Sequence, residues 1–333
     1  MNIRMKILSF AATALTLVIC GNSCQGKNGS QTAESAGADT TQQAAVPQFS
    51  ADSAYAYVKA QCDFGPRVPG TDAHKRCAAY LEQALRATCD SVMVQHGNVT
   101  TFDGKNLNIS NVIGVVNPSA EQRILLMAHW DCRPWADQDP DASKHKEPVM
   151  GANDGASGVG VLLELARMMK AQRPNVGVDI VLVDAEDWGD TDSDNEDSWA
   201  LGTQYWCRNP HYGNAKPIFG VVVDMVGASG AKFSKEYFSM QYGSSFVDLV
   251  WTAAAEAGYG NFFVANGGGA VTDDHVSVNK IAGIPCIDII DMRTDSKTGF
   301  YDGWHTTHDT FDRIDPATLK AVGQTLAQVI YSY

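Results

Sequence analysis

Three stretches of this 333-residue sequence end in the same way, with a short apolar run that stops at acidic or histidine side chains. Short apolar runs bounded by polar residues are typical of strands buried on both faces of a helix-covered parallel sheet. The carboxyl ends of parallel strands share one edge of an open sheet, where ligand crevices form. The sequence therefore predicts that side chains following the three runs meet at one site. The stretches are RILLMAHWD, VDIVLVDAED and IFGVVVDMVG, which supply His129, Asp131, Glu186, Asp187 and Asp224.

Helical and strand periodicities alternate after Phe49, which favours an α/β fold with a mixed, mostly parallel central sheet flanked by helices. The first two predicted strands are long and close in sequence, so we expect them to pair antiparallel at one edge of the sheet. The predicted helices are Ala51–Gln61, Asp72–Ala87, Ser157–Ala171, Leu201–Arg208, Ser245–Ala257 and Ala317–Tyr331. The predicted strands are Ser91–Phe102, Leu107–Val116, Arg123–Ala128, Val178–Val183, Pro217–Val223, Tyr237–Gln241 and Ile284–Ile289.

The N-terminal residues have the pattern of an export signal. Arg4 and Lys6 precede an apolar run, Ile7–Ile19, that is too short to cross a bilayer as a helix. Cys24 stands where a bacterial lipoprotein would be cleaved and lipidated, and ordinary signal cleavage nearby is the alternative. We therefore expect residues 1–23 to be a signal segment. The mature protein would be exported, either periplasmic or anchored to the envelope through a lipid on Cys24, with no other membrane attachment.

The composition changes after the signal segment. Residues 24–48 are small and polar, with no aromatic side chain, which predicts a flexible linker. One catalytic domain follows over residues 49–333, and we expect it to be a monomer. The formal net charge of −13 and the pI near 4.9 argue against a nucleic-acid partner, because phosphate binding requires a basic surface. Peptides, small molecules or cations are the expected ligands.

Six cysteines lie outside the export segment. An exported location permits disulfides, but their pairing cannot be read from the sequence. No CxxC pair is present, which argues against a structural zinc knuckle. The six are Cys62, Cys77, Cys89, Cys132, Cys207 and Cys286.

Two further segments add candidate metal ligands. Asp154 lies among small residues at the start of a predicted helix, where an N-cap role is the alternative. His305 and His308 precede the last helix, where an ordinary surface position is the alternative. The combination of these residues with the strand-end acids favours a metal site, because carboxylate and imidazole groups are ligands of Zn²⁺.

The ordered series of motifs resembles the zinc-dependent exopeptidases of the aminopeptidase-type α/β fold. The series is His-x-Asp, Asn-Asp-Gly-Ala-Ser-Gly, Asp-x-Glu-Asp, Asp-Met-Val-Gly-Ala and Trp-His-Thr, and it spans almost the whole domain. The resemblance implies a zinc-exopeptidase-like fold in which Asp154, Asp187 and His305 bind the metal. It implies that Glu186 is the general base.

Within that group the sequence is similar to the animal-type glutaminyl cyclases. The similarity lies in Asp273-Asp274-His275, in Trp304 directly before His305, and in the tryptophans near the acidic pair. It implies that Glu186, Asp224 and Asp273 are catalytic acids, with the last two expected to form a hydrogen-bonded pair. The residues that the resemblance assigns to substrate binding are Trp304, Trp188, Trp199 and His129.

Two departures from the family pattern concern the acidic pair and the loop after it. Asp187 stands where both families more often have Glu, whose side chain is longer by one methylene. The backbone or the metal would therefore have to shift by about that length. The loop DWGDTDSDNEDSW is longer and more acidic than in the animal enzymes. In dinuclear peptidases the equivalent of His129 binds a second metal together with the equivalent of Asp224, whereas the cyclases use one zinc.

The sequence thus predicts a glutaminyl-peptide cyclotransferase with one Zn²⁺ per chain. It would convert the N-terminal glutamine of peptides or proteins to pyroglutamate and release ammonia. The alternatives are a dinuclear zinc aminopeptidase and, from a different class, an envelope binding protein without activity. Asp184 is expected to serve the fold through hydrogen bonds. Asp137, Asp139 and Asp141 are expected to form a solvated acidic loop, with Ca²⁺ binding as the alternative.

Overall fold

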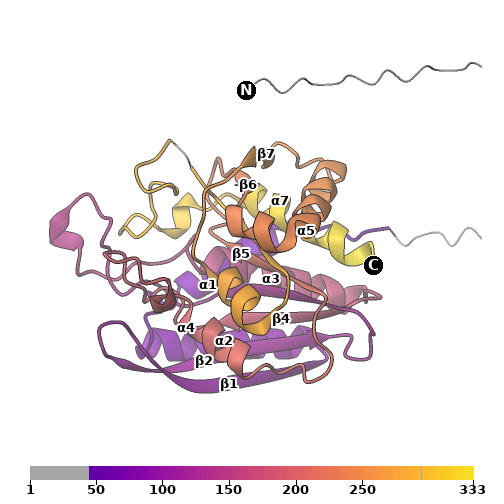
Figure 1. The fold of residues 1–333 in the computed structure, drawn as a ribbon, viewed down its shortest axis with the longest axis horizontal. Helices are drawn as coiled ribbons and strands as arrows, with labels where there is room; N and C mark the ends of the chain where they lie inside the picture. Colours follow the sequence, from indigo (N-terminus) through magenta and orange to yellow (C-terminus); the bar gives the residue numbers. More distant parts are fainter. Residues whose placement is uncertain (1–44, 294) are drawn as a thin grey trace, which may run out of the picture. The chain divides into compact units, whose positions relative to one another are not determined.

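The computed structural model describes residues 45–333 except residue 294 (Figure 1). The predicted signal segment and the predicted linker up to residue 44 lie outside the described residues. The side chain of Gln324 donates to the carbonyl of Pro47 at 3.2 Å, so the chain contacts the domain before Phe49. Within this described range, no helix is long and apolar enough to cross a membrane.

The core of the fold is a six-stranded mixed sheet with the order β1-β2-β4-β3-β5-β8. The neighbouring strands β4, β3, β5 and β8 run parallel, while β1 pairs antiparallel with β2 and β2 antiparallel with β4. The predicted mixed sheet and its antiparallel edge pair are therefore confirmed. The strands are β1 (Ser91–Thr100), β2 (Asn106–Val116), β3 (Arg123–His129), β4 (Gly177–Val183), β5 (Phe219–Asp224) and β8 (Cys286–Ile290). A separate two-stranded sheet, which the sequence did not predict, joins β6 (Phe233–Lys235) to β7 (Phe263–Gly267).

Helices cover both faces of the sheet, as the fully apolar strands require. One large core cluster joins one face to five helices, and Figure 1 shows two of these, α5 and α7, side by side. A smaller cluster joins the other face to α4 (Leu201–Arg208) and to the π-helical turn η3 (Val278–Ala282). The five helices are α1 (Ala51–Cys62), α2 (Asp72–Thr88), α3 (Ala156–Ala171), α5 (Tyr237–Glu256) and α7 (Pro316–Tyr331). Short turns complete the order: η1 (Ala142–Lys144), η2 (Glu196–Ser198), α6 (Asp274–Ser277) and η4 (Phe311–Arg313).

The predicted strand Tyr237–Gln241 is wrong, because these residues form the first turns of α5. Their aromatic composition favours a strand, but a cap overrides this local preference. The carboxylate of Glu236 accepts the backbone N–H groups of Phe238 at 2.9 Å and Ser239 at 2.6 Å. The helix is kinked at Gly243 (φ −147°, ψ 39°), and its second half contains the predicted helix that begins at Ser245.

Glu236 also joins α5 to the segment that leads into α6. Its carboxylate accepts the N–H of Val271 at 3.0 Å and lies 3.1 Å from Nε2 of His275. Burial acts to raise the pKa of Glu236, but the hydrogen bond and charge of His275, with the N–H groups of the helix cap, lower this pKa to about 2. Because this acid binds four partners from two segments, it is a main determinant of their relative position.

We expect Glu236→Gln to destabilise the fold at neutral pH. The pKa falls from 4.5 to about 2 on folding, which corresponds to ~3 kcal/mol of stability at pH 7. A lowered acid pKa stabilises the fold above the unfolded value, and this contribution is lost as the pH falls through the folded value. The stability difference between wild type and variant should therefore shrink to roughly half at pH 3. Chemical denaturation at both pH values checks this, with Glu256→Gln at the exposed end of α5 as control, and a pH-independent difference would contradict it.

Candidate metal centre and catalytic pocket

The backbone turns sharply where the strands deliver the predicted site residues. β3 ends at His129, β5 ends at Asp224, and the residues after β4 lead to Glu186. Four non-glycine residues around the site have positive φ: two follow β4 and β5, one is the N-cap of α4, and one is His305 itself. This conformation is held only when the surrounding structure enforces it. Such strain gathers at functional sites, and here it aims the acidic side chains away from the strand direction. The four are Ala185 (φ 51°), Ala200 (φ 54°), Met225 (φ 48°) and His305 (φ 54°).

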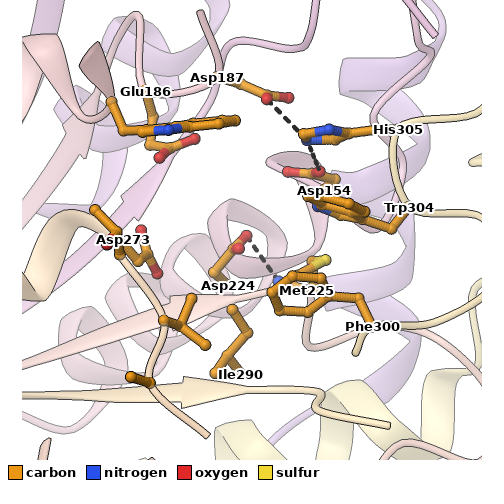
Figure 2. A pocket seen from close by; sticks show the side chains of 14 residues that line it. Asp154, Glu186, Asp187, Asp224, Met225, Asp273, Ile290, Phe300, Trp304 and His305 are labelled. Carbon is orange, nitrogen blue, oxygen red and sulfur yellow. Dashed lines mark hydrogen bonds and ion pairs between the residues drawn. The ribbon is translucent and has the colours of Figure 1, made fainter. Parts of the chain in front are cut away.

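The three predicted metal ligands lie together, and Figure 2 shows them along one side of the pocket. Nε2 of His305 is 3.1 Å from Oδ1 of Asp187 and 3.7 Å from Oδ2 of Asp154. All three side chains are buried, and within residues 45–333, residue 294 aside, Oδ2 of Asp187 has no hydrogen-bond partner. Two carboxylates and one imidazole with an unpartnered buried oxygen fit a zinc ion that keeps one position open. The shorter Asp187 side chain therefore still reaches the other two ligands.

Burial shifts the ionisation of this centre. It raises the pKa of Asp187 to about 7, and burial together with the charge of Arg133 lowers the pKa of His305 to about 3. The imidazole is therefore neutral at physiological pH, which is the form that binds a metal. A divalent cation would also favour the ionised form of Asp187 and offset the repulsion between the buried carboxylates.

A second group of candidate ligands shares Asp154. Nε2 of His129 lies 3.0 Å from Oδ1 of Asp154 and 3.2 Å from Oδ1 of Asp224. His129 is almost fully buried and does not line the pocket. The structure therefore places His129 outside the pocket lining, beside Asp154 and Asp224, and its predicted contact with substrate stays a prediction.

Two buried acids hold the backbone of the ligand-bearing segments. Asp131, a ligand candidate in the sequence, instead accepts the N–H groups of Glu186 at 3.0 Å and Asp187 at 3.3 Å. Asp309 accepts the N–H of Asp154 at 3.0 Å, and the hydroxyl of Tyr301 donates to it. Asp309 was not among the predicted site residues, although its position directly after His308, in a segment rich in motif residues, could have indicated a role near the site.

The N-cap alternative for Asp154 is excluded by the local geometry. The N-cap of α3 is Gly155, so the Asp154 carboxylate is free to face the histidines. Gly155 has φ +98°, and a Cβ there would lie 2.6 Å from the carbonyl oxygen of Asp131. Only glycine allows α3 to start this close to β3.

A pocket of about 230 Å³ opens beside the metal ligands. Its polar lining includes Glu186, Asp224 and Asp273, and Figure 2 shows Glu186 and Asp273 across the cavity from His305. Burial raises the pKa of Glu186 well above its usual range and that of Asp224 to about 7. The pocket thus combines apolar walls with three acids, two of which have raised pKa values. The apolar lining residues are Trp199, Met225, Ala270, Val271, Ile290, Phe300 and Trp304.

The expected hydrogen bond between Asp224 and Asp273 is not present among the described residues. Oδ1 of Asp224 accepts the N–H of Met225 at 2.8 Å and faces His129, while Oδ1 of Asp273 accepts the N–H of Asp274 at 2.5 Å. Each acid is thus bound to the backbone of its own turn. Asp273 instead groups with two buried side chains of the core, His275 and Asp288, and the sequence analysis missed Asp288 because it lies inside an apolar strand.

The predicted tryptophans divide into two kinds. Trp304 and Trp199 line the pocket, and their rings stack on His305 with centroid distances of 3.7 and 6.0 Å. The predicted substrate contact of Trp188 is wrong. Its ring packs edge-on against Trp135, and its Nε1 donates to Asp103 at 3.2 Å, because the turn after the acidic pair directs it into a separate apolar cluster.

Asp184 serves the fold, as expected from the sequence. It is fully buried, and its carboxylate lies 2.8 Å from Nε2 of His74. The same carboxylate accepts the N–H groups of Ser110 at 2.7 Å and Ala185 at 2.8 Å. These bonds join α2, β2 and the strained turn that carries Glu186.

The acids of the loop after β3 make structural hydrogen bonds. Asp137 binds the Arg133 guanidinium, Asp139 accepts the N–H of Thr307 at 2.9 Å, and Asp141 caps η1. They do not gather into a possible cation site within the described part of the chain, so the calcium alternative has no support. The expectation of a merely solvated loop is also wrong for Asp139, which is buried.

His308 and the cysteines lie outside the pocket lining. His308 is exposed and contributes no side chain to the pocket. All six cysteines of the described chain are free thiols, and all but Cys62 are buried. The domain therefore has no disulfide framework and depends on its core.

The fold and the site define a zinc exopeptidase-like α/β protein. Residues 111–330 match Peptidase family M28, and the chain belongs to this family. The family and the donor set together identify zinc as the metal.

Three known proteins illustrate the range of similarity. The structure of a Bacteroides thetaiotaomicron glutaminyl cyclase bound to N-acetylhistamine is 48% identical and superposes with a TM-score of 0.84, covering 87% of this chain and 100% of that one. A Bos taurus glutaminyl-peptide cyclotransferase is 23% identical over 68% of this chain and 66% of its own length. The aminopeptidase YwaD of Bacillus subtilis is 26% identical over 68% of this chain, which spans only 45% of that protein.

We expect zinc to stabilise the protein through Asp187. Zinc added to chelator-treated wild type at about 100 times its Kd should raise the free energy of unfolding by about 2.7 kcal/mol. Asp187→Asn keeps the shape but removes the anionic ligand, so its zinc affinity should fall at least about tenfold. Zinc titration followed by thermal unfolding measures both quantities. Asp248→Asn, on the surface of α5, is the control, and equal zinc affinity of the Asp187 variant and wild type would remove Asp187 from the ligand set.

Proposed function

We propose that this protein is a glutaminyl-peptide cyclotransferase. The observation that carries the proposal is a small aromatic pocket in which three acids, Glu186, Asp224 and Asp273, lie together with the zinc ligands. A peptidase needs one base to activate water, whereas cyclisation must hold an amine, an amide and departing ammonia in one closed space. The similarity to a solved glutaminyl cyclase over the whole length of that structure supports the proposal.

The reaction joins the α-amine nitrogen of an N-terminal glutamine to its own side-chain carbonyl carbon and breaks the bond from that carbon to the amide nitrogen. Asp154, Asp187 and His305 would hold the zinc ion, which would supply a Lewis acid for the carbonyl oxygen. Glu186 takes a proton from the α-ammonium and delivers it to the departing ammonia. Its raised pKa suits both roles. Trp199 and Trp304 bound the pocket and exclude water.

We propose one zinc ion per chain. Oδ1 of Asp224 already accepts the N–H of Met225 and lies within hydrogen-bond distance of His129, so this oxygen has two partners without a second metal. Asp187 retains the unpartnered oxygen expected of an open ligand. His129 thus orients Asp154 and Asp224 by hydrogen bonds.

The second candidate is a dinuclear aminopeptidase, which the grouping of His129, Asp154 and Asp224 favours. In that enzyme the group would hold a second zinc, and Glu186 would activate water. Elemental analysis with two assays separates the candidates. One zinc with ammonia release from glutaminyl peptides supports the cyclase, whereas two zinc ions with faster leucine release from leucyl peptides support the peptidase.

We propose that the protein acts on exported peptides or proteins with N-terminal glutamine. The basic residues and apolar run before Cys24 support export, with a lipid at Cys24 as the only membrane attachment, and the domain would act as a monomer. The acidic charge supports the absence of a nucleic-acid partner. Cell fractionation checks the location.

We expect Glu186→Gln to lower turnover by at least about a hundredfold while zinc content and thermal stability stay near wild type. Glutamine keeps the shape of the side chain but cannot carry a proton, and the zinc ligands remain in place. Ammonia release, metal analysis and thermal unfolding of one preparation test this. Activity above about a hundredth of wild type would contradict the proton-transfer role.

We expect Trp304→Ala to raise KM for glutaminyl peptides more than it lowers stability, because it removes a pocket wall beside His305. Trp188→Phe is the matched control, since this tryptophan lies in the separate apolar cluster. Steady-state kinetics of both variants are the measurement. A KM effect of Trp188→Phe equal to that of Trp304→Ala would show that the pocket assignment is wrong.

A further inference from the structure

The two ring nitrogens of His305 face different acids. Nε2 lies 3.1 Å from Asp187 and 3.7 Å from Asp154, the other two metal ligands (Figure 2). Nδ1 is buried, has no hydrogen-bond partner within the described chain, and lies 3.6 Å from Oδ1 of Asp137. A histidine that binds a metal through one nitrogen is oriented by the group that its other nitrogen contacts. Asp137 is therefore in place to orient the ring of His305.

Asp137 is itself held by Arg133. Nε of Arg133 donates to Oδ1 of Asp137 at 2.6 Å, and Nη2 donates to Oδ2 at 2.9 Å, so the pair is bidentate. Two parallel, charge-assisted hydrogen bonds of this kind fix the direction of both side chains as well as their distance. The hydroxyl of Thr191 also donates to Oδ2, at 2.7 Å. The Asp137 carboxylate therefore has little freedom to turn away from His305.

The same guanidinium also contacts Asp187. Nη1 of Arg133 donates to the backbone carbonyl of Asp187 at 3.2 Å and to Oδ1 of its carboxylate at 3.4 Å. The carbonyl of Gly189 accepts from Nη1 as well, at 3.3 Å. These contacts use Oδ1 of Asp187, and Oδ2 is left without a hydrogen-bond partner among the residues that the structure describes. Arg133 thus holds one metal ligand directly, and the acid that it binds faces a second ligand.

A purely structural role is the alternative, because a bidentate pair four residues apart also fixes the loop after β3. Glu164 and Arg167 of α3 form a comparable pair, with a buried acid and hydrogen bonds of 2.6 and 2.8 Å. The pair of Arg133 and Asp137 differs because each member also faces a metal ligand. Stabilisation of the loop alone would not require these additional contacts.

We propose that Arg133 and Asp137 are positioning residues of the metal centre, which hold Asp187 and His305 in the geometry that zinc requires. The Nδ1–H group of His305 donates to Asp137, so that Nε2 is the nitrogen available to the metal. Arg133 fixes the Asp187 carboxylate through Oδ1, so that Oδ2 is available. The inference concerns metal binding and is the same whether the site cyclises glutamine or hydrolyses peptides.

The test titrates the zinc-loaded full protein with a chelator of known zinc affinity. Asp137→Asn keeps the shape of the side chain but removes the charge that holds both partners, so the zinc Kd should rise about tenfold or more. Arg133→Lys keeps the positive charge but replaces the planar fork with a single ammonium group, and the Kd should rise by about the same factor. An effect of charge alone would leave the Kd of Arg133→Lys unchanged.

Glu164→Gln is the matched control, because it removes one negative charge from a bidentate pair outside the pocket lining. Chemical denaturation of the metal-free protein should show that this variant is less stable than wild type, while its zinc Kd stays within about twofold of wild type. Cobalt(II) in place of zinc provides a second measurement, because its visible absorption reports the geometry of the ligands. The cobalt bands should change in Asp137→Asn and Arg133→Lys but not in Glu164→Gln.

Three results would overturn the proposal: a wild-type zinc affinity in Arg133→Lys, a wild-type zinc affinity in Asp137→Asn, or an equal loss of affinity in Glu164→Gln. If Asp137→Asn does not fold, Arg133→Lys decides, since it is the more conservative change. Ammonia release from a glutaminyl peptide by wild type tests the proposed function separately. A wild type that binds zinc but releases no ammonia would refute that function, and the zinc affinities would still decide the roles of Arg133 and Asp137.

Discussion

The crowding of buried carboxylates at one edge of the sheet is the constraint on which this structure depends. Asp154, Glu186, Asp187, Asp224 and Asp273 all lie in or beside one small cavity, where low dielectric strengthens their repulsion. The raised pKa values of Asp187 and Asp224 are the direct result of this burial. A cation at the ligand group offsets part of the repulsion, so metal binding and the stability of the site are coupled.

Hydrogen bonds from backbone N–H groups to buried acids fix the positions of the segments that carry these carboxylates. Asp131 and Asp309 bind the N–H groups of the ligand-bearing turns, and Asp184 binds the strained turn at Ala185. The positive φ of Ala185 is held by the bond from its N–H to Asp184, and that of Met225 by the bond from its N–H to Asp224. The fold therefore holds the side chains of the site in place before substrate binds, and such preorganisation is a condition for an efficient site.

The aromatic side chains connect the metal to substrate selection. Trp304 and Trp199 stack on the ring of His305 and also form walls of the pocket. The same two side chains therefore position this candidate metal ligand and limit the size of the molecule that can enter the pocket.

The sequence alone was sufficient for the main sheet and most helices, and it named three side chains that the structure brings together as a possible metal-binding group. Apolar runs of β3, β4 and β5 end in polar residues, and this pattern identifies parallel strands and their common edge from local chemistry. Asp154, Asp187 and His305 followed from family motifs that keep their order along the chain. Local patterning failed for residues 237–241, where the cap by Glu236 overrode strand propensity.

Tertiary structure decided which way each side chain faces. Trp188 and Trp199 both lie near the acidic pair in the sequence, which gives no reason to prefer either as a pocket residue. The turn geometry places Trp199 at the pocket and Trp188 in a separate apolar cluster. The hydrogen bonds of Asp131 and Asp309 join segments far apart in the chain. The grouping of His129 with Asp154 and Asp224, and of Asp288 with Asp273 and His275, depends on such segments too. Sequence patterns report period and composition, whereas these contacts arise from the packing of strand ends against one another, and that packing exists only in the folded chain.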